Sequence, residues 1–370
     1  MGLSPEEKRI DLIFILVFVT ICNIILIIVL IAKCKKKESF YPVIGPSDNI
    51  PKLKWPFLNL INDKKEKVPI IVIRAYLDNP KHREQLIKYY EEGWKILGCS
   101  SNQSFPRCCD NPYGQYANCK NKHNQKIGGK DIEDYVIGWC HCMREPDKYI
   151  KKGTPLLLCS ESDFNSLDLV KNSGSVNLKK KYDYIAVQKK YENGQCKNTW
   201  HSYYKNWPLC EKCIQILSDD MGLKGLIIGW EDCPINIKNK SRVDTTKMLK
   251  YYKFLEKLKQ SKFLLLPNLE EASARIETEA LACNVPIFVY ENILGGWKYV
   301  NDETGLFFNE NNIKKQAEIM MEKIKKNQFN PRDNYAKNYD INMGIILKNW
   351  LKTLYPELPN YEWVKFAISG

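Results

Sequence analysis

Short apolar runs alternate with amphipathic stretches along most of this 370-residue chain, and this alternation restricts the fold more than any other feature. A short apolar run followed by a helical pattern is typical of a strand in a parallel sheet covered by helices. The strand-like runs form two series, divided at about residue 178: residues 68–76, 95–101 and 154–164, then 182–187, 223–229, 262–268, 285–292 and 305–308. The sequence therefore predicts an α/β protein with two Rossmann-like, doubly wound domains and a cleft between them.

The segment Leu12–Ala32 holds 21 residues without a charged side chain, enough to cross the roughly 30 Å hydrocarbon core of a bilayer. It is longer than the apolar core of a signal peptide and lacks a small-residue cleavage site, so we expect one transmembrane helix before the folded domains. Lys8 and Arg9 precede it, and four lysines follow at residues 33–37. The positive-inside rule therefore favours a cytosolic C-terminal region, with a lumenal one as the alternative.

The basic excess, 56 Lys and Arg against 43 Asp and Glu, gives a net charge of +13. Such a charge suits an anionic membrane surface or a phosphorylated substrate. The sequence carries no RNA-binding signature and no Cys2His2 finger spacing, so we expect a membrane partner and no nucleic acid. The Lys-, Asn- and Ile-rich composition is typical of an AT-rich genome, which leaves both a host and a viral membrane open.

The chain contains fourteen cysteines, whose state depends on the compartment. They would be mainly buried reduced thiols in the cytosol, whereas in a lumen they could pair. The glycosylation sequons at Asn102 and Asn239 matter in the lumenal case alone. One alternative is a zinc cluster, but its spacing matches no standard site, so we expect no metal. Its members would be Cys108, Cys109, Cys119, Cys140 and Cys142.

Two glutamates, Glu271 and Glu279, follow the strand-like run KFLLLPN at residues 262–268. Ligands of open parallel sheets bind beyond the carboxyl ends of the strands. The small residues Ala272, Ser273 and Ala274 would let backbone N–H groups approach a diphosphate at a helix N-terminus. Eight residues span about 12 Å along a helix, which suits one carboxylate on sugar hydroxyls and the other on a ribose. The alternative is a pair of glutamates on a solvated helix face.

The string from Pro267 to Pro286 resembles the Glu-x7-Glu motif of the family-four glycosyltransferases and their glycogen synthase and sucrose synthase relatives. That motif follows a Pro-Ser turn and leads into EAMACGxPV, where this chain has EALACNVP. Downstream, Gly295 and Gly296, and then Thr304 and Gly305, are similar to the family's Gly-Gly turn and its DGETGLLV segment. The resemblance covers about residues 220–310. It implies the GT-B fold, a nucleotide sugar as substrate, retention of anomeric configuration, and neither a cofactor nor an obligatory metal.

The chain also departs from that family. Gly-Phe-Gly usually follows the first glutamate, and an Arg and a Lys usually follow the first strand of the C-terminal domain. This chain offers Lys189 and Lys190 there, with Lys197 and Lys205 farther on. Lys189 and Lys190 are the candidate diphosphate cations, without the bidentate geometry of Arg. In the N-terminal half, His141 is the candidate acid/base or acceptor-site residue; the alternative is a hydrogen-bonded structural histidine.

The predicted organisation follows from these features. It comprises a tail (1–11), a transmembrane helix (12–32), a basic, proline-containing tether (33–67), an N-terminal acceptor domain (68–178) with an insertion at 99–150, a C-terminal nucleotide-sugar domain (179–330), and C-terminal helices (331–370) that pack back on the N-terminal domain. We expect a membrane-anchored glycosyltransferase acting on a glycan, lipid-linked or protein acceptor. The predicted site residues are Glu271 and His141 for catalysis, and Glu279, Ala272, Ser273, Ala274, Lys189, Lys190, Gly295 and Gly296 for the donor. The alternative function is a non-catalytic scaffold of the same fold, such as a viral membrane component.

Overall fold

The computed structural model describes residues 50–77, 79–102, 105–107, 126–165, 168, 178–190 and 193–367. They belong to one compact unit, residues 50–370. The membrane segment predicted at residues 12–32 lies outside the described part of the chain. Within the described part, no helix combines the length and the apolar composition that a membrane span requires.

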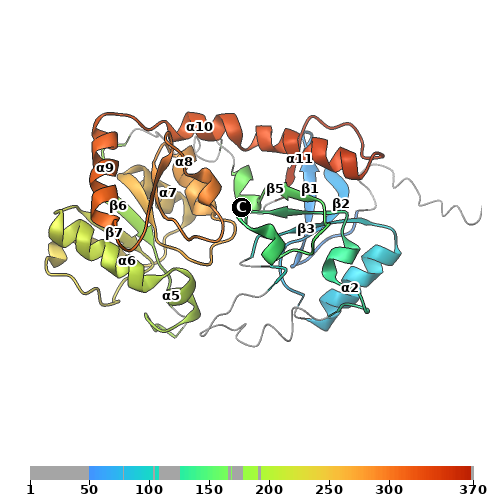
Figure 1. Ribbon diagram of the computed structural model, residues 1–370, viewed down its shortest axis with the longest axis horizontal. Coiled ribbons are helices and arrows are strands. Elements are labelled where there is room, and N and C mark those ends of the chain that lie inside the picture. Colours follow the sequence, from blue (N-terminus) through green and yellow to red (C-terminus); the bar gives the residue numbers. More distant parts are fainter. Residues whose placement is uncertain are drawn as a thin grey trace, which may run out of the picture. The chain divides into compact units, whose positions relative to one another are not determined.

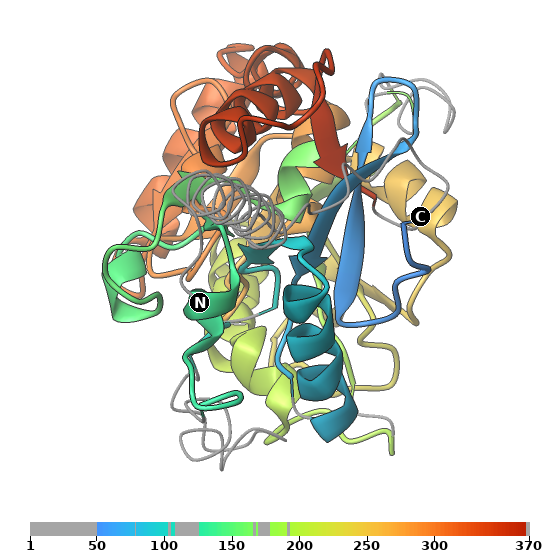
Figure 2. The same ribbon diagram turned by 90° about the vertical axis from the view of Figure 1, so that its right-hand side faces the viewer.

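The N-terminal sheet has six strands in the order β12-β1-β2-β3-β4-β5. Their bounds are β1 Phe57–Asn62, β2 Lys67–Ile73, β3 Lys95–Cys99, β4 Gly138–His141, β5 Leu156–Leu158 and β12 Val364–Phe366. Strands β2 to β5 are parallel, whereas β1 runs antiparallel to both β2 and β12. Figure 2 shows β12 in red beside β1 in blue. Helix α2 (Pro80–Glu91) follows β2 and begins where the Asn79 side chain accepts a hydrogen bond from Lys81 N.

This sheet corrects two expectations. The tether predicted over residues 33–67 is wrong over residues 57–62, because these residues form β1 and bury Leu60 in the core. Its partner β12 comes from the other end of the chain, so no local pattern marked the pairing. The N-terminal sheet is also not doubly wound as expected. Its parallel strands β2 to β5 follow one another in chain order, so their order never reverses.

The C-terminal sheet is parallel throughout, in the order β8-β7-β6-β9-β10-β11. Its strands are β6 Tyr182–Val187, β7 Gly225–Ile228, β8 Val243–Thr246, β9 Ser261–Leu266, β10 Ile287–Tyr290 and β11 Gly305–Phe308. The chain starts at β6, moves outward to β8, and then crosses to the other side of β6 to form β9. The strand order therefore reverses between β6 and β9, the position at which open α/β sheets bind ligands.

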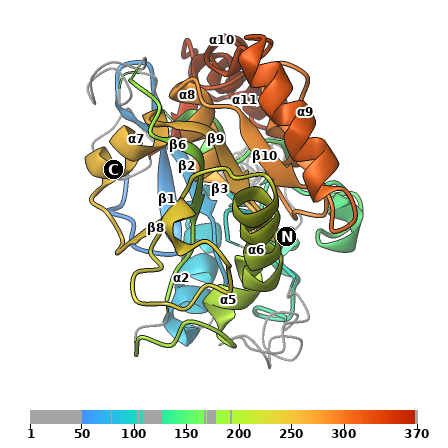
Figure 3. The ribbon, with the colours of Figure 1, turned by 90° about the vertical axis from the view of Figure 1, so that its left-hand side faces the viewer.

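Helices cover both faces of the C-terminal sheet (Figure 3). They are α5 Trp200–Tyr204, α6 Trp207–Ile214, α7 Tyr251–Lys259, α8 Arg275–Ala282 and α9 Ile313–Lys325, and α6 runs on into a π-helical segment, Gln215–Asp220. Helices α6 and α9 pack with Phe263 and Phe288 on one face. Helices α7 and α8 pack with Leu264 and Ile287 on the other. Neighbouring residues of one strand thus enter different cores, as the two-residue period of a strand requires.

Two further helices follow α9 in the C-terminal segment (Figure 1). Helix α10 (Pro331–Asn338) packs on α8, and α11 (Ile341–Leu354) packs on β12. The last segment therefore contacts elements of both domains. Short 3-10 helices complete the described elements: η1 Ile132–Tyr135, η2 Pro146–Lys148, η3 Glu161–Phe164, η5 Lys240–Arg242 and η6 Trp297–Tyr299.

A buried ion pair joins η3 to η6. Asp163 is fully buried and accepts hydrogen bonds from Lys298 Nζ at 2.7 Å and from Tyr299 Oη at 2.6 Å. Burial alone would lower the pKa of Lys298, but the Asp163 carboxylate outweighs it and the pKa is raised. Beside this pair, Ser162 N donates to Ser273 Oγ at 3.0 Å. These contacts fix the loops that follow β9 and β10 against the N-terminal domain.

Candidate functional site

A cavity of about 380 Å³ opens at the carboxyl ends of the C-terminal strands. It is lined by Val187, Lys205, Ile228, Met248, Leu249, Tyr251, Phe254, Glu271, Ser273, Arg275, Ile276 and Glu279. Val187 ends β6 and Ile228 ends β7, whereas Glu271 follows β9. The volume falls within the range of small-molecule sites. Both glutamates of the motif therefore line one cavity, next to the point where the strand order reverses.

Glu271 is held in place at the cavity wall by two donors. Its Oε2 accepts hydrogen bonds from Lys205 Nζ and from Asn268 Nδ2, each at 2.8 Å. The side chains of Lys205 and Glu271 are 13% and 22% exposed, so both are shielded but still reach the cavity. Oε2 accepts both bonds, so among the described residues Glu271 Oε1 remains available to a ligand.

Lys205 is the cation that the structure brings to this carboxylate. It follows α5 and precedes Asn206, whose left-handed backbone (φ 50°) turns the chain into α6. Burial would lower the pKa of Lys205, but Glu271 reverses that effect and raises it, so the ammonium is charged at neutral pH. Sequence reasoning placed Lys205 among the more distant lysines. The insertion between β6 and α6 gives no periodic signal that would have singled it out.

Glu279 lies inside α8 and is mostly buried. Burial raises its pKa to about 7, opposed by Arg275 and by a hydrogen bond from the Tyr251 hydroxyl. Helix α8 begins at Arg275, so Glu271 precedes it. The expected separation of about 12 Å along one helix is therefore wrong, because residues 271–274 turn instead of continuing the helix.

Small residues pack closely around Glu271. Gly295 N donates to Glu271 O at 2.8 Å, and a β-carbon at Gly295 would lie 1.9 Å from Ala272 O. Gly296 has a left-handed backbone (φ 83°), and a β-carbon there would lie 2.0 Å from Glu277 Oε2. Ala274 forms the N-cap of α8. Larger side chains at these glycines would displace the loop that carries Glu271.

Of the ten sequence-predicted site residues, Glu271, Ser273 and Glu279 line this cavity. The other seven do not: His141, Lys189, Lys190, Ala272, Ala274, Gly295 and Gly296. Lys189 is exposed, and Lys190 Nζ donates to Glu231 O at 2.5 Å. His141 ends β4 and is buried. Burial, with a further contribution from Lys298, lowers the pKa of His141 to about 4, so the imidazole is neutral at pH 7.

Arg275 and Tyr251 are cavity residues that sequence reasoning missed. Arg275 is the first residue of α8, and its Nε is buried without a hydrogen-bond partner among the described residues. A guanidinium in this position presents a fork of donors suited to phosphate. An arginine inside the Glu-x7-Glu string was the available signal. Tyr251 begins α7, and nothing in its local sequence connects it with Glu279.

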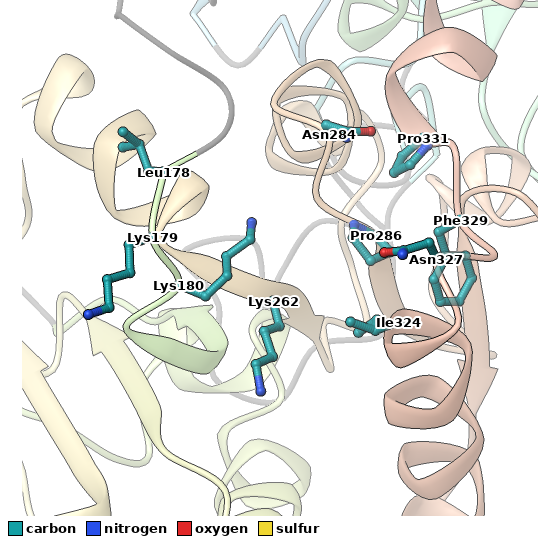
Figure 4. A pocket seen from close by; sticks show the side chains of 10 residues that line it. All are labelled: Leu178, Lys179, Lys180, Lys262, Asn284, Pro286, Ile324, Asn327, Phe329 and Pro331. Carbon is teal, nitrogen blue, oxygen red and sulfur yellow. The ribbon is translucent and has the colours of Figure 1, made fainter.

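A second cavity, of about 460 Å³, lies at the amino ends of β6, β9 and β10 (Figure 4). Lys179, Lys180 and Lys262 line it, but their side chains point in different directions. Lys180 Nζ donates to Lys259 O at 3.0 Å and Ser261 O at 2.9 Å, and Lys262 Nζ pairs with Asp183 at 2.7 Å. Because two of the three lysines are satisfied by the protein, this cavity is a poor anion site.

Among the described residues, no three His, Cys, Asp or Glu side chains are placed to hold a metal ion. Cys140 and Cys142, two members of the alternative zinc cluster, are buried thiols. Burial raises the pKa of Cys142 to about 12. Cys108, Cys109 and Cys119 lie outside the described residues.

No protein-family model matches the chain, and no curated protein matches it in sequence. Its structure is similar to that of TarM, at 12% identity and a TM-score of 0.52, over 77% of this chain and 54% of that one. It is also similar to the sucrose-phosphate synthase of Thermosynechococcus elongatus, at 9% identity and a TM-score of 0.51, over 77% of this chain and 74% of that one. The chain thus spans little more than half of TarM. At these identities the likeness shows the fold, so the described unit is a GT-B-like α/β protein with two Rossmann-like domains.

Proposed function

We propose that this protein is a glycosyltransferase that moves a sugar from a nucleotide-sugar donor to a glycan, lipid-linked or protein acceptor. The observation that carries the proposal is the placement of Glu271, Glu279 and Lys205 around one cavity at the β6/β9 reversal. A nucleotide sugar offers three groups in a row: a ribose, a diphosphate and a hexose. The cavity offers carboxylates for the two polyols and cations for the charge between them.

Each side chain has a role in this proposal. The Glu279 carboxylate accepts hydrogen bonds from ribose hydroxyls, and the unbound oxygen of Glu271 accepts from sugar hydroxyls. Lys205 and Arg275 neutralise the diphosphate. The apolar wall, which includes Val187, Ile228 and Phe254 among other residues, takes the flat nucleobase.

The chemistry follows from the charge distribution. As the bond between the sugar and the diphosphate breaks, negative charge grows on the leaving phosphate oxygen. Lys205 and Arg275, fixed beside it, stabilise that charge without reorganisation. The acceptor's hydroxyl oxygen forms a bond to the anomeric carbon, and the departing phosphate oxygen accepts its proton, which fits retention of configuration and needs no metal.

His141 is a weak candidate for a general base in this scheme. A base works best when its pKa lies near the working pH, and the pKa of His141 is about 4. It also does not line the donor cavity. We therefore route no proton transfer through His141, and an acceptor-site role for it stays a prediction.

We also propose that residues 12–32 anchor the enzyme in a membrane as a single span. The support is their length and their lack of charged side chains. The anchor would hold the described unit near an acceptor in, or attached to, the same membrane.

A donor screen tests the proposed function. Residues 50–370 form one compact unit that contains both sheets, so they can be studied without the apolar segment. Thermal shift and nucleoside diphosphate release would be measured with uridine, guanosine and adenosine diphosphate sugars. We expect nucleotides with one of the three bases to raise the melting temperature. The nucleotide sugars with that base should release nucleoside diphosphate. The absence of any binding would contradict the proposed donor site and favour the non-catalytic scaffold alternative.

A further inference from the structure

A disulfide between Cys196 and Cys233 joins the loop after β6 to the loop after β7. The other cysteines for which the structure gives a state are free and buried: Cys99, Cys140, Cys142, Cys159, Cys210, Cys213 and Cys283. Burial raises the pKa of each of these thiols, which keeps them unreactive in any compartment. The paired cysteines are at the edge of the core, and Cys196 is partly exposed. Disulfides of this kind persist in oxidising compartments and are rare in the cytosol.

The same loop that begins near Cys233 carries the sequon Asn239-Lys240-Ser241. Asn239 is exposed, and its Oδ1 accepts hydrogen bonds from Ser241 N at 3.2 Å and Ser241 Oγ at 2.7 Å. The Asp219 carboxylate accepts from Lys238 N and Asn239 N, which holds the loop on the surface. With Oδ1 engaged by the serine of the sequon, the structure shows no bond from Asn239 Nδ2, the nitrogen that a glycan would join.

A glycan at Asn239 would not block the donor cavity. Strand β8 (Val243–Thr246) separates the two, because Asn239 precedes its amino end and the cavity residue Met248 follows its carboxyl end. The other sequon begins at Asn102, but its serine, residue 104, lies outside the described residues. Asn239 is therefore the acceptor for which the structure shows an exposed and complete sequon.

We propose that the folded domain matures on the oxidising, lumenal side of the membrane, with the Cys196–Cys233 disulfide closed and Asn239 N-glycosylated. The proposal rests on the proposed membrane anchor at residues 12–32, and it is independent of the transferase activity. It opposes the cytosolic side that the lysine and arginine count favours. That count compares four basic residues after the span with two before it. The disulfide and the exposed sequon belong to the folded domain itself.

Both reactions balance with co-reactants of the secretory pathway. Closing the disulfide takes two electrons and two protons from the two thiols, and a disulfide-exchange oxidant accepts the electrons. In glycosylation, Asn239 Nδ2 forms a bond to the anomeric carbon of a lipid-diphosphate-linked oligosaccharide. The bond from that carbon to the phosphate oxygen breaks, Nδ2 loses a proton, and the lipid diphosphate departs.

The experiment expresses the full chain in insect cells and follows its electrophoretic mobility before and after endoglycosidase. We expect the wild type to shift by one glycan, and Asn239→Gln and Ser241→Ala to lose that shift. Asn236→Gln is the matched control, because Asn236 lies in the same loop but starts no sequon. An unglycosylated wild type would overturn the proposal, as would a single glycan that survives in Asn239→Gln.

A second readout examines the disulfide in the same membranes. Free thiols are alkylated before lysis, and the peptides that contain Cys196 and Cys233 are then mapped with and without reductant. We expect the two peptides to be joined and to separate on reduction. If both cysteines are alkylated without reductant, the oxidising side is excluded. Neither readout involves a nucleotide, so a failure here leaves the proposed transferase function untouched.

Discussion

Lys205 Nζ lies 2.8 Å from Glu271 Oε2, and this ion pair joins the segments that follow β6 and β9, the two strands between which the sheet order reverses. In an empty cavity the lysine is neutralised by the glutamate. A diphosphate arriving between them would share the ammonium, which frees Glu271 for the sugar. In the proposed function, the pair would therefore link recognition of the diphosphate to recognition of the hexose.

Substituting Lys205 tests this link. Charge-assisted hydrogen bonds contribute about 1.5–3 kcal/mol, so Lys205→Met should weaken nucleoside diphosphate binding by roughly ten- to a hundredfold. Binding of the uncharged nucleoside should change little. Lys190→Met is the matched control, because Lys190 bonds to Glu231 O away from the cavity. Calorimetric titration measures the affinity for both ligands. An equal loss of nucleoside diphosphate affinity in the two lysine variants would show that Lys205 does not bind the diphosphate.

Donor binding should depend on pH through Glu279. Its pKa is about 7 in the folded protein, so its ionised fraction rises about tenfold between pH 6 and pH 8. If the carboxylate accepts from the ribose, affinity for a nucleotide sugar should rise severalfold over that interval. A nucleotide sugar is the right ligand, because its diphosphate does not titrate there. Glu279→Gln should give a flat profile, and the same slope in both proteins would assign the effect to another group.

Ionisation of Glu279 should strengthen donor binding, but it should lower the stability of the folded protein. Its folded-state pKa lies above the ordinary value of 4.5, so between about pH 4.5 and 7 the folded protein binds more protons than the unfolded chain. Its contribution to the free energy of unfolding therefore decreases as pH rises through this window and is constant above it. Urea unfolding of wild type and Glu279→Gln at pH 5 and pH 8 measures this. The variant should gain stability relative to wild type at pH 8, and an unchanged difference between the two pH values would contradict the burial.

Glu277 should show the same pH-dependent effect on stability as Glu279, but it should have no part in donor binding. It is fully buried, neither carboxylate oxygen has a partner among the described residues, and burial with the nearby Glu271 raises its pKa well above 4.5. Ionising it is costly, so Glu277→Gln should stabilise the protein increasingly as pH rises above about 4.5. Thermal melting from pH 4 to pH 9 measures the difference. Destabilisation of the Gln variant at pH 8 would show that the charged form has an unrecognised partner.

The ion pair between Asp163 and Lys298 should dominate the stability of the contact between the two domains. Removing one member of a buried pair costs about 3–5 kcal/mol, because it leaves an uncompensated charge. Lys298→Met should therefore lower the free energy of unfolding by about that amount. The matched control is Lys326→Met, because Lys326 and Glu322 are exposed partners and this substitution should change stability far less. Equal effects in denaturant unfolding would contradict the role of the buried pair.

The sequence predicted the parts of this fold that leave a local pattern. The strands β6, β7, β9 and β10 are short apolar runs between helical segments, and their placement followed directly. Strands β1 and β12 could not be predicted, because they pair across almost the whole chain. Strand β4 is four residues long and sits in a turn-rich region, where no periodicity develops.

Some residues of the candidate site could likewise be predicted from the sequence, and others could not. Glu271 and Glu279 belong to one continuous string, so their placement in one cavity could be expected from the sequence. Lys205 enters the cavity from a different segment, through a turn at Asn206, and Tyr251 enters from the start of α7. Lys189 and Lys190 directly follow β6, but neither lines the cavity. Proximity in sequence was a poor guide wherever a loop reverses direction.

The most direct test of the central claim is a calorimetric comparison of Glu271→Gln and Glu279→Gln with the wild type. Each protein is titrated with a nucleotide sugar and with its free nucleoside diphosphate. If Glu271 binds the hexose and Glu279 the ribose, Glu279→Gln weakens both ligands by roughly tenfold or more, since a charge-assisted bond is lost in each. Glu271→Gln weakens the nucleotide sugar by a similar factor and leaves the nucleoside diphosphate almost unchanged. Wild-type affinity for both ligands in both variants would show that this cavity is not the donor site.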